Sequence, residues 1–190
     1  MNTLEEVQSF LGVIVPSGAI DSSLAISEKL DQSEVAALLP ERPPQLYVSK
    51  AVALNSNGKN VVLATVPVTE EMCRGHFEWF PMMPLAILAQ AAGQAGALLV
   101  LLLNREVNSG RVPLAVQVKE VKSVSTKSGS ERRDFIVPGD TLLLRAEYIG
   151  GRVYFHKAGI MAFVGNCAMA SLDEITYVLV EKARFKQEGR

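Results

Sequence analysis

Cysteine, histidine and net charge are all scarce in this sequence of 190 residues. The two cysteines, Cys73 and Cys167, are far apart and lack metal-ligand spacing, so they indicate reduced thiols in a cytosolic protein and predict no metal site. A formal net charge of -1 gives no broad attraction to nucleic acid or to an anionic membrane surface. The N-terminus, from Met1 to Glu6, is acidic where a secretory signal would be basic. We therefore expect a cytoplasmic protein that binds no nucleic acid.

Charge is also missing from one long apolar segment, Leu85 to Leu103. Its length is about that of a membrane span. However, Gln90, Gln94 and two glycines interrupt the segment, and two prolines precede it. These features favour the alternative, a helix buried at the centre of a domain, and we expect no membrane span.

The rest of the chain divides into one domain with extensions, which is the simplest arrangement for this length. Residues 1–30 are predicted as a partly helical N-terminal extension, because apolar residues from Leu4 to Leu11 recur at helical spacing. Residues 31–175 form the single domain. Residues 176–190 are predicted as a charged C-terminal tail.

Within the domain, strand patterns lie on both sides of the apolar helix. Two β-rich segments, 46–54 and 60–68, are joined by a hairpin turn at Asn57-Gly58. Further strand patterns follow the helix, and the polar segment from Ser123 to Arg133 is predicted as a solvated loop or a long hairpin tip. A helix that is apolar on nearly every side must be covered. We therefore predict an α+β fold in which a curved antiparallel sheet wraps around the helix, with a second copy covering what remains.

The chemistry is predicted to centre on Gly75-His76-Phe77, a tight loop just before the apolar helix. Part-way along the helix, Gln90 places a polar side chain on an otherwise apolar surface. An acid/base pair directed at a hydrophobic substrate has this arrangement, except that the expected carboxylate is here an amide.

Four motifs resemble the beta-hydroxyacyl-[acyl carrier protein] dehydratases of fatty-acid synthesis. They are Leu39-Pro40-x-Arg42-x-Pro44, Gly75-His76-Phe77 with Pro81 and Pro84, Gln94 in the helix, and Val137-Pro138-Gly139-Asp140. Their order and spacing match from about Leu38 to Leu172. The resemblance implies the hotdog fold, an antiparallel sheet around a central helix. It also implies a homodimer, or a higher homo-oligomer, with active sites at the subunit interface.

The resemblance also implies site residues. By motif position His76 is the base that removes the proton alpha to a thioester carbonyl, and Gln90 stands where the family has its acid. The backbone N–H groups of Leu85 and Ala86 would polarise the carbonyl, and Phe77 and Pro84 would line the substrate. No cofactor is implied, because the substrate is carried on the phosphopantetheine arm of acyl carrier protein or coenzyme A.

Three departures from the family weaken the expected catalysis. A carboxamide cannot exchange a proton near neutral pH, and losing a general acid typically lowers a rate by about 10²–10⁴. Leu85 replaces the family's glycine at the helix start, and Glu78 replaces a proline. Glu78 could supply the missing acid, or it could be a solvated loop carboxylate.

Three functions remain open from the sequence. The first is a dehydratase-like lyase acting on beta-hydroxyacyl thioesters in fatty-acid or polyketide metabolism, with activity weakened by Gln90. The second is a non-catalytic acyl-binding protein, or a subunit of a hetero-oligomer whose partner supplies the carboxylate. The third is an acyl thioesterase.

Overall fold

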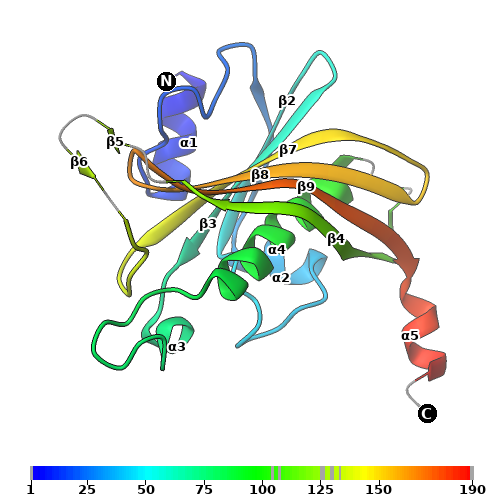
Figure 1. The fold of residues 1–190 in the computed structure, drawn as a ribbon. Helices are drawn as coiled ribbons and strands as arrows, with labels where there is room; N and C mark the ends of the chain where they lie inside the picture. The colour runs from blue at the N-terminus through cyan, green and yellow to red at the C-terminus, as the bar shows by residue number, and fades with distance from the viewer. Residues whose placement is uncertain are drawn as a thin grey trace.

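A curved antiparallel sheet encloses the longest helix in the computed structural model (Figure 1). The structure describes residues 2–103, 105–106, 108–124, 127–128, 131–132 and 134–188, with only the backbone of 127–128, 131–132 and 186–188. Seven described strands form the main sheet in the order β1-β2-β3-β7-β8-β9-β4. Their bounds, in that order, are Ala25–Leu30, Lys50–Ser56, Lys59–Pro67, Thr141–Arg152, Phe155–Val164, Cys167–Glu181 and Arg111–Ser123.

The described helices are α1 (Thr3–Leu11), α2 (Gln32–Leu38), α3 (Glu70–Cys73), α4 (Leu85–Leu103) and α5 (Lys182–Glu188). A short ladder joins β5 (Lys127–Ser128) to β6 (Glu131–Arg132) within the segment predicted as a loop or hairpin tip. The other residues from 125 to 133 lie outside the described part of the chain.

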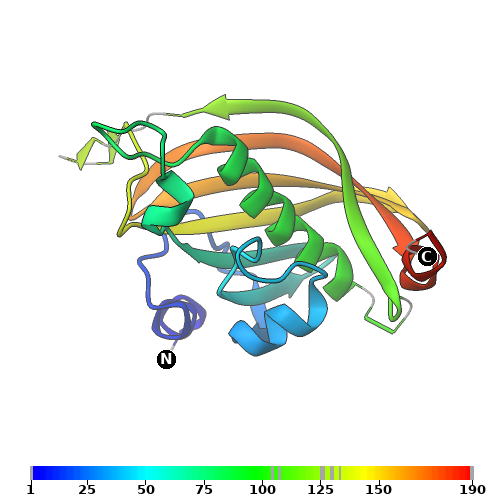
Figure 2. The same cartoon turned by 90° about the horizontal axis from the view of Figure 1, so that it is seen from below.

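Helix α4 is the centre of the larger hydrophobic core and lies across the concave face of the sheet (Figure 2). Alanines such as Ala91, Ala92 and Ala95 are fully buried, and their small side chains let the strands approach the helix closely. The helix is long and apolar enough to cross a membrane, but most of it is buried inside this sheet. The predicted central helix and hotdog fold are thus confirmed.

The N-terminal extension forms a second core on the opposite, convex side of the sheet (Figure 1). Val7 and Leu11 of α1 pack with residues of β2, β3 and β7, including Val52 and Leu63. The extension then enters the sheet itself as β1, paired with β2. The domain boundary that the sequence predicted at residue 30 therefore falls at the end of a sheet strand, and β9 likewise continues past residue 175 to Glu181.

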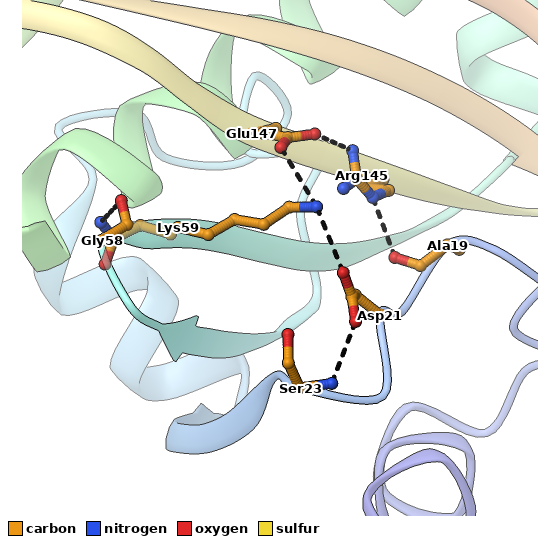
Figure 3. A network of polar contacts seen from close by, with 8 residues as sticks. Ala19, Asp21, Ser23, Gly58, Lys59, Arg145 and Glu147 are labelled. Atoms are coloured by element: carbon orange, nitrogen blue, oxygen red, sulfur yellow. Dashed lines mark hydrogen bonds and ion pairs between the residues drawn. The ribbon is translucent and has the colours of Figure 1, made fainter.

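A network of polar contacts attaches this extension to the sheet (Figure 3). The Arg145 Nε–H donates to the carbonyl oxygen of Ala19 over 2.8 Å, and its Nη1 lies 2.6 Å from Glu147 Oε2. The Lys59 ammonium lies 3.5 Å from Glu147 and 3.9 Å from Asp21. Burial alone would raise the pKa of Glu147, but the bonds and charges of Arg145 and Lys59 together hold this pKa below its usual value.

Candidate active site

The loop that carries His76 is closed by backbone hydrogen bonds on both sides. The His76 N–H donates to the Cys73 carbonyl at the end of α3 over 3.0 Å, and the His76 carbonyl accepts from Met82 over 2.8 Å. Gly75 has a φ of 79°, a left-handed conformation that glycine adopts without steric cost. The Met83 N–H then donates to Ile136 over 2.8 Å. The loop is therefore fixed between α3, the start of α4 and the segment after β6.

The same loop fixes the tautomer of the His76 ring. Its Nδ1 lies 3.2 Å from the carbonyl oxygen of Met82. A carbonyl oxygen can only accept, so Nδ1 carries the hydrogen of the neutral ring and donates it. Nε2 is left with a lone pair, which is the form that a general base requires.

Phe77 and Glu78 follow His76 in an exposed part of the loop. The Phe77 ring stacks on the imidazole with 4.4 Å between the ring centroids, so it walls one side of His76. Glu78 lines an open cavity together with Glu70, Arg74 and Phe77. Among the described contacts, no hydrogen bond or ion pair joins Glu78 to His76. Both interpretations of Glu78, a solvated loop carboxylate and an acid that acts on the substrate, stay predictions.

The start of α4 offers two free backbone donors. The Pro84 carbonyl accepts from Ile87 over 3.0 Å and from Leu88 over 3.1 Å. Leu85 and Ala86 stand in the first turn, exposed, and no described hydrogen bond uses their N–H groups. Unpaired N–H groups at a helix start attract a polarised carbonyl oxygen or an anion.

Gln90 lines an open cavity of about 460 Å³ further along α4. One wall is α4 with Gln90, Gly93 and Gln94, and the others come from residues 40–47, from Tyr177 and from β4. His76 is not among the lining residues. Within one subunit, the structure therefore places the two principal site residues in different surroundings.

Gln94 forms hydrogen bonds with the backbone of residues 45–48, part of which lines this cavity. It is only 4% exposed, its Oε1 accepts from the N–H groups of Tyr47 (2.9 Å) and Val48 (3.3 Å), and its Nε2 donates to the Gln45 carbonyl over 2.6 Å. The strand predicted from residue 46 begins only at Lys50, because these backbone groups bond to the helix instead of to a neighbouring strand.

Tyr47 is a site residue that the sequence did not predict. Its hydroxyl lies 2.9 Å from Gln90 Oε1 and 3.0 Å from Gln45 Oε1, and burial raises the pKa of this phenol. The sequence signal was an aromatic residue with a polar tip in an apolar segment. The hydrogen bond of its backbone N–H to Gln94 holds Tyr47 beside Gln90, and the sequence alone does not indicate this contact.

Comparison with solved structures places the chain in the hotdog class. The dehydratase heterocomplex ApeI:P from Xenorhabdus doucetiae matches with a TM-score of 0.56 and 11% identity, covering 81% of this chain and 95% of that one. The fluoroacetyl-CoA thioesterase FlK also matches with a TM-score of 0.56, at 12% identity over 70% of this chain and 95% of its own. Likeness at this level of identity shows the shared fold alone.

The sequence comparison identifies the family within that class. The 3-hydroxyacyl-[acyl-carrier-protein] dehydratase FabZ of Lawsonia intracellularis is 30% identical over 154 residues, which are 80% of this chain and 94% of that protein. The chain therefore belongs to the FabZ family of 3-hydroxyacyl-[acyl-carrier-protein] dehydratases. No family model matches the sequence.

Proposed function

We propose that this protein removes water from 3-hydroxyacyl thioesters carried on acyl carrier protein, in a homodimer that needs no cofactor. Each site would combine His76 of one subunit with Gln90 of the other. The observation that carries this proposal is the hydrogen bond of His76 Nδ1 to the Met82 carbonyl, which leaves Nε2 with a lone pair as a base requires. Membership of the FabZ family supports the substrate class.

The edge of the sheet at β4 supports the dimer. β4 is bonded only to β9 among the described strands, and Leu114, Val116 and Val118 along it are exposed. An unpaired edge with apolar side chains is a template for pairing with another strand. The Gln90 cavity is partly lined by this strand, at Leu114 and its neighbours. A second copy paired along β4 would therefore cover that cavity.

The proposed reaction needs one proton carrier. His76 Nε2 takes the proton from C2 of the acyl chain, and the Leu85 and Ala86 N–H groups stabilise the negative charge that develops on the thioester oxygen. The C3–O bond then breaks, and the leaving hydroxide takes the proton from the imidazolium of His76. The products are a 2-enoyl thioester and water. Gln90 holds the hydroxyl by a hydrogen bond but transfers no proton, while Phe77 and Pro84 wall the acyl chain.

Thioester hydrolysis is the second candidate, because a carboxamide can also hold a water molecule for attack on a carbonyl. The hotdog thioesterase among the similar structures shows that this fold supports that activity. A third outcome is acyl binding without turnover, which would follow if dehydration requires a carboxylate at position 90.

One assay separates these outcomes. Purified protein is incubated with a 3-hydroxyacyl carrier-protein substrate, and mass spectrometry follows loss of water from the acyl chain. We expect slow dehydration that His76→Ala abolishes, while Gln90→Glu raises the rate by about 10²-fold or more by restoring an acid. The matched control is His156→Gln, which alters the other histidine of the chain.

The remaining results have distinct meanings. Release of free acid without dehydration would identify a thioesterase. An inert wild type that Gln90→Glu activates would identify a non-catalytic acyl-binding protein. Loss of activity in Glu78→Gln would assign the proton donor to Glu78 and remove His76 as the only carrier.

A further inference from the structure

The Tyr47 hydroxyl lies between two carboxamides, and it cannot satisfy both in the same way. Gln90 Oε1 is 2.9 Å from the hydroxyl oxygen and Gln45 Oε1 is 3.0 Å from it. A hydroxyl has one hydrogen to donate, so only one of these amide oxygens can accept it. The other amide must turn its NH₂ group towards Tyr47, an exchange of O and N that leaves the shape of the side chain unchanged.

Two arrangements satisfy all three groups. In the first, Tyr47 donates to Gln90 Oε1, Gln45 donates to the Tyr47 oxygen, and the Gln90 NH₂ group faces the cavity. In the second, Tyr47 donates to Gln45, Gln90 donates to the Tyr47 oxygen, and the Gln90 carbonyl faces the cavity. The hydrogen of Tyr47 therefore decides whether the site offers a donor or an acceptor to its ligand.

The neighbouring donors favour the first arrangement. Among the residues that line the cavity, Gln94 Nε2 is used by the Gln45 carbonyl and the Tyr177 hydroxyl is used by the Gly93 carbonyl. The Tyr47 hydroxyl is the donor within reach of Gln90 Oε1. Gln45 and Gln90 are both exposed, so water can satisfy the outward half of either amide, and the shorter of the two Tyr47 contacts, 2.9 Å against 3.0 Å, is the one to Gln90.

Tyr47 can hold this arrangement because it is itself fixed. Its side chain is 6% exposed, and its backbone N–H is bonded to Gln94 one helical turn from Gln90. Burial raises the pKa of the phenol, so the Tyr47 hydroxyl keeps its hydrogen at neutral pH.

We propose that Tyr47 is a positioning residue that turns the Gln90 NH₂ group into the cavity, so that the site binds acyl thioesters with an acceptor oxygen at C3. This inference rests on the proposed function. It names two ligands, 3-hydroxyacyl and 3-oxoacyl thioesters. An ionised carboxylate at position 90 offers only acceptors and could not bind the carbonyl of a 3-oxoacyl chain. Gln90 thereby widens the ligand class instead of only weakening catalysis.

The test measures binding rather than turnover. Three pantetheine conjugates of equal chain length, joined by a stable amide, carry a 3-oxo group, a 3-hydroxy group or no substituent. Calorimetry gives their affinities for the purified protein.

We expect the wild type to bind the 3-oxo conjugate about 3–10-fold more tightly than the unsubstituted one, which is the contribution of one hydrogen bond. Tyr47→Phe removes this preference, measured as the ratio of the 3-oxo affinity to the unsubstituted affinity within the variant. Gln90→Glu loses the 3-oxo preference but still binds the 3-hydroxy conjugate more tightly than the unsubstituted one, because a hydroxyl can donate to a carboxylate.

A spectroscopic readout separates orientation from mere stability. The side-chain NH₂ signal of Gln90 is assigned in a ¹⁵N spectrum by its loss in Gln90→Glu. We expect the 3-oxo conjugate to shift this signal in the wild type and to leave it unshifted in Tyr47→Phe. Tyr154→Phe, which removes an exposed phenol hydroxyl elsewhere, is the control and should behave as the wild type.

Each adverse outcome has one meaning. If all three conjugates bind and Tyr47→Phe keeps the 3-oxo preference, the role of Tyr47 is overturned and the proposed function stands. If the unsubstituted conjugate binds as tightly as the 3-oxo one in the wild type, the donor orientation of Gln90 is overturned. If none of the conjugates binds, the proposed function and this inference are both overturned.

Discussion

The phenol ring of Tyr177, on β9, lies directly against Gly96 of α4. A Cβ built at Gly96 would lie 2.7 Å from Tyr177 Cζ and closer still to the hydroxyl oxygen. That hydroxyl donates to the Gly93 carbonyl over 3.1 Å, and burial raises the pKa of Tyr177 far above its usual value. Gly96→Ala should therefore lower the free energy of unfolding by about 1–3 kcal/mol, measured by urea denaturation, because the helix or the ring must move.

Gly93→Ala is the matched control, in the same helix and one turn earlier. A Cβ at Gly93 meets nothing within 4 Å. Alanine is a better helix former than glycine by about 1 kcal/mol, so this variant should keep or raise the stability of the protein. Equal destabilisation by both substitutions would show that α4 tolerates no added methyl group at all, and that contact with Tyr177 is not the cause.

A second prediction concerns the buried amide of Gln94. Gln94→Leu leaves the N–H groups of Tyr47 and Val48 and the carbonyl of Gln45 without their partner. Each unsatisfied buried group costs about 1–3 kcal/mol. Because water can reach part of the segment, we expect a total loss of about 2–4 kcal/mol in the free energy of unfolding. Gln90→Leu, which changes an exposed glutamine on the same helix face, should cost much less in the same denaturation experiment. A loss below 1 kcal/mol for Gln94→Leu would contradict this role.

The central part of this fold could be predicted from the sequence because its signals are local. The charge-free segment 85–103 became α4, and the turn at Asn57-Gly58 joins β2 to β3. By contrast, only Leu30 of β1 is buried, and a bulge lies between Ile26 and Glu28, so this strand shows no clean alternation of apolar and polar residues. Its place in the sheet depends on packing with the convex-face core, which the sequence does not reveal.

The candidate site stays a prediction, and the sequence could point only to residues that carry a local signal. His76 and Gln90 stood out through a motif and a break in an apolar helix. Tyr47 did not, because its role depends on hydrogen bonds to residues more than 40 positions away in the chain. The tautomer of His76 likewise depends on how the loop folds back to Met82. Long-range polar contacts of this kind leave no periodic pattern in a sequence.

A third prediction concerns the pH dependence of stability. Burial lowers the pKa of His156 below the usual 6.5, and a backbone hydrogen bond opposes this only in part. On acidification the unfolded chain takes up a proton at this residue before the folded chain does, so stability falls as the pH drops below about 6.5. Above that pH the residue is neutral in both states and has no effect. Denaturation at about pH 7.5 and about pH 5.5 should show a smaller acid-induced loss in His156→Gln than in the wild type. An identical loss in both proteins would assign the pH dependence to other groups.

The last prediction concerns the edge of the sheet at β4. Val116 is 57% exposed on β4, the strand proposed to pair with its copy. Val116→Lys places a charge at this edge, and two such charges would face one another across a symmetric interface. Light scattering coupled to size exclusion should then show a shift from dimer to monomer, with loss of thioester processing because the partner's Gln90 no longer meets His76. Ile14→Lys is the matched control, since Ile14 is 54% exposed in the N-terminal extension, which packs on residues of β2, β3 and β7 instead of β4. If both variants remain dimeric and active, the subunits pair through a different surface, and the cavity beside β4 is not the place where His76 and Gln90 come together.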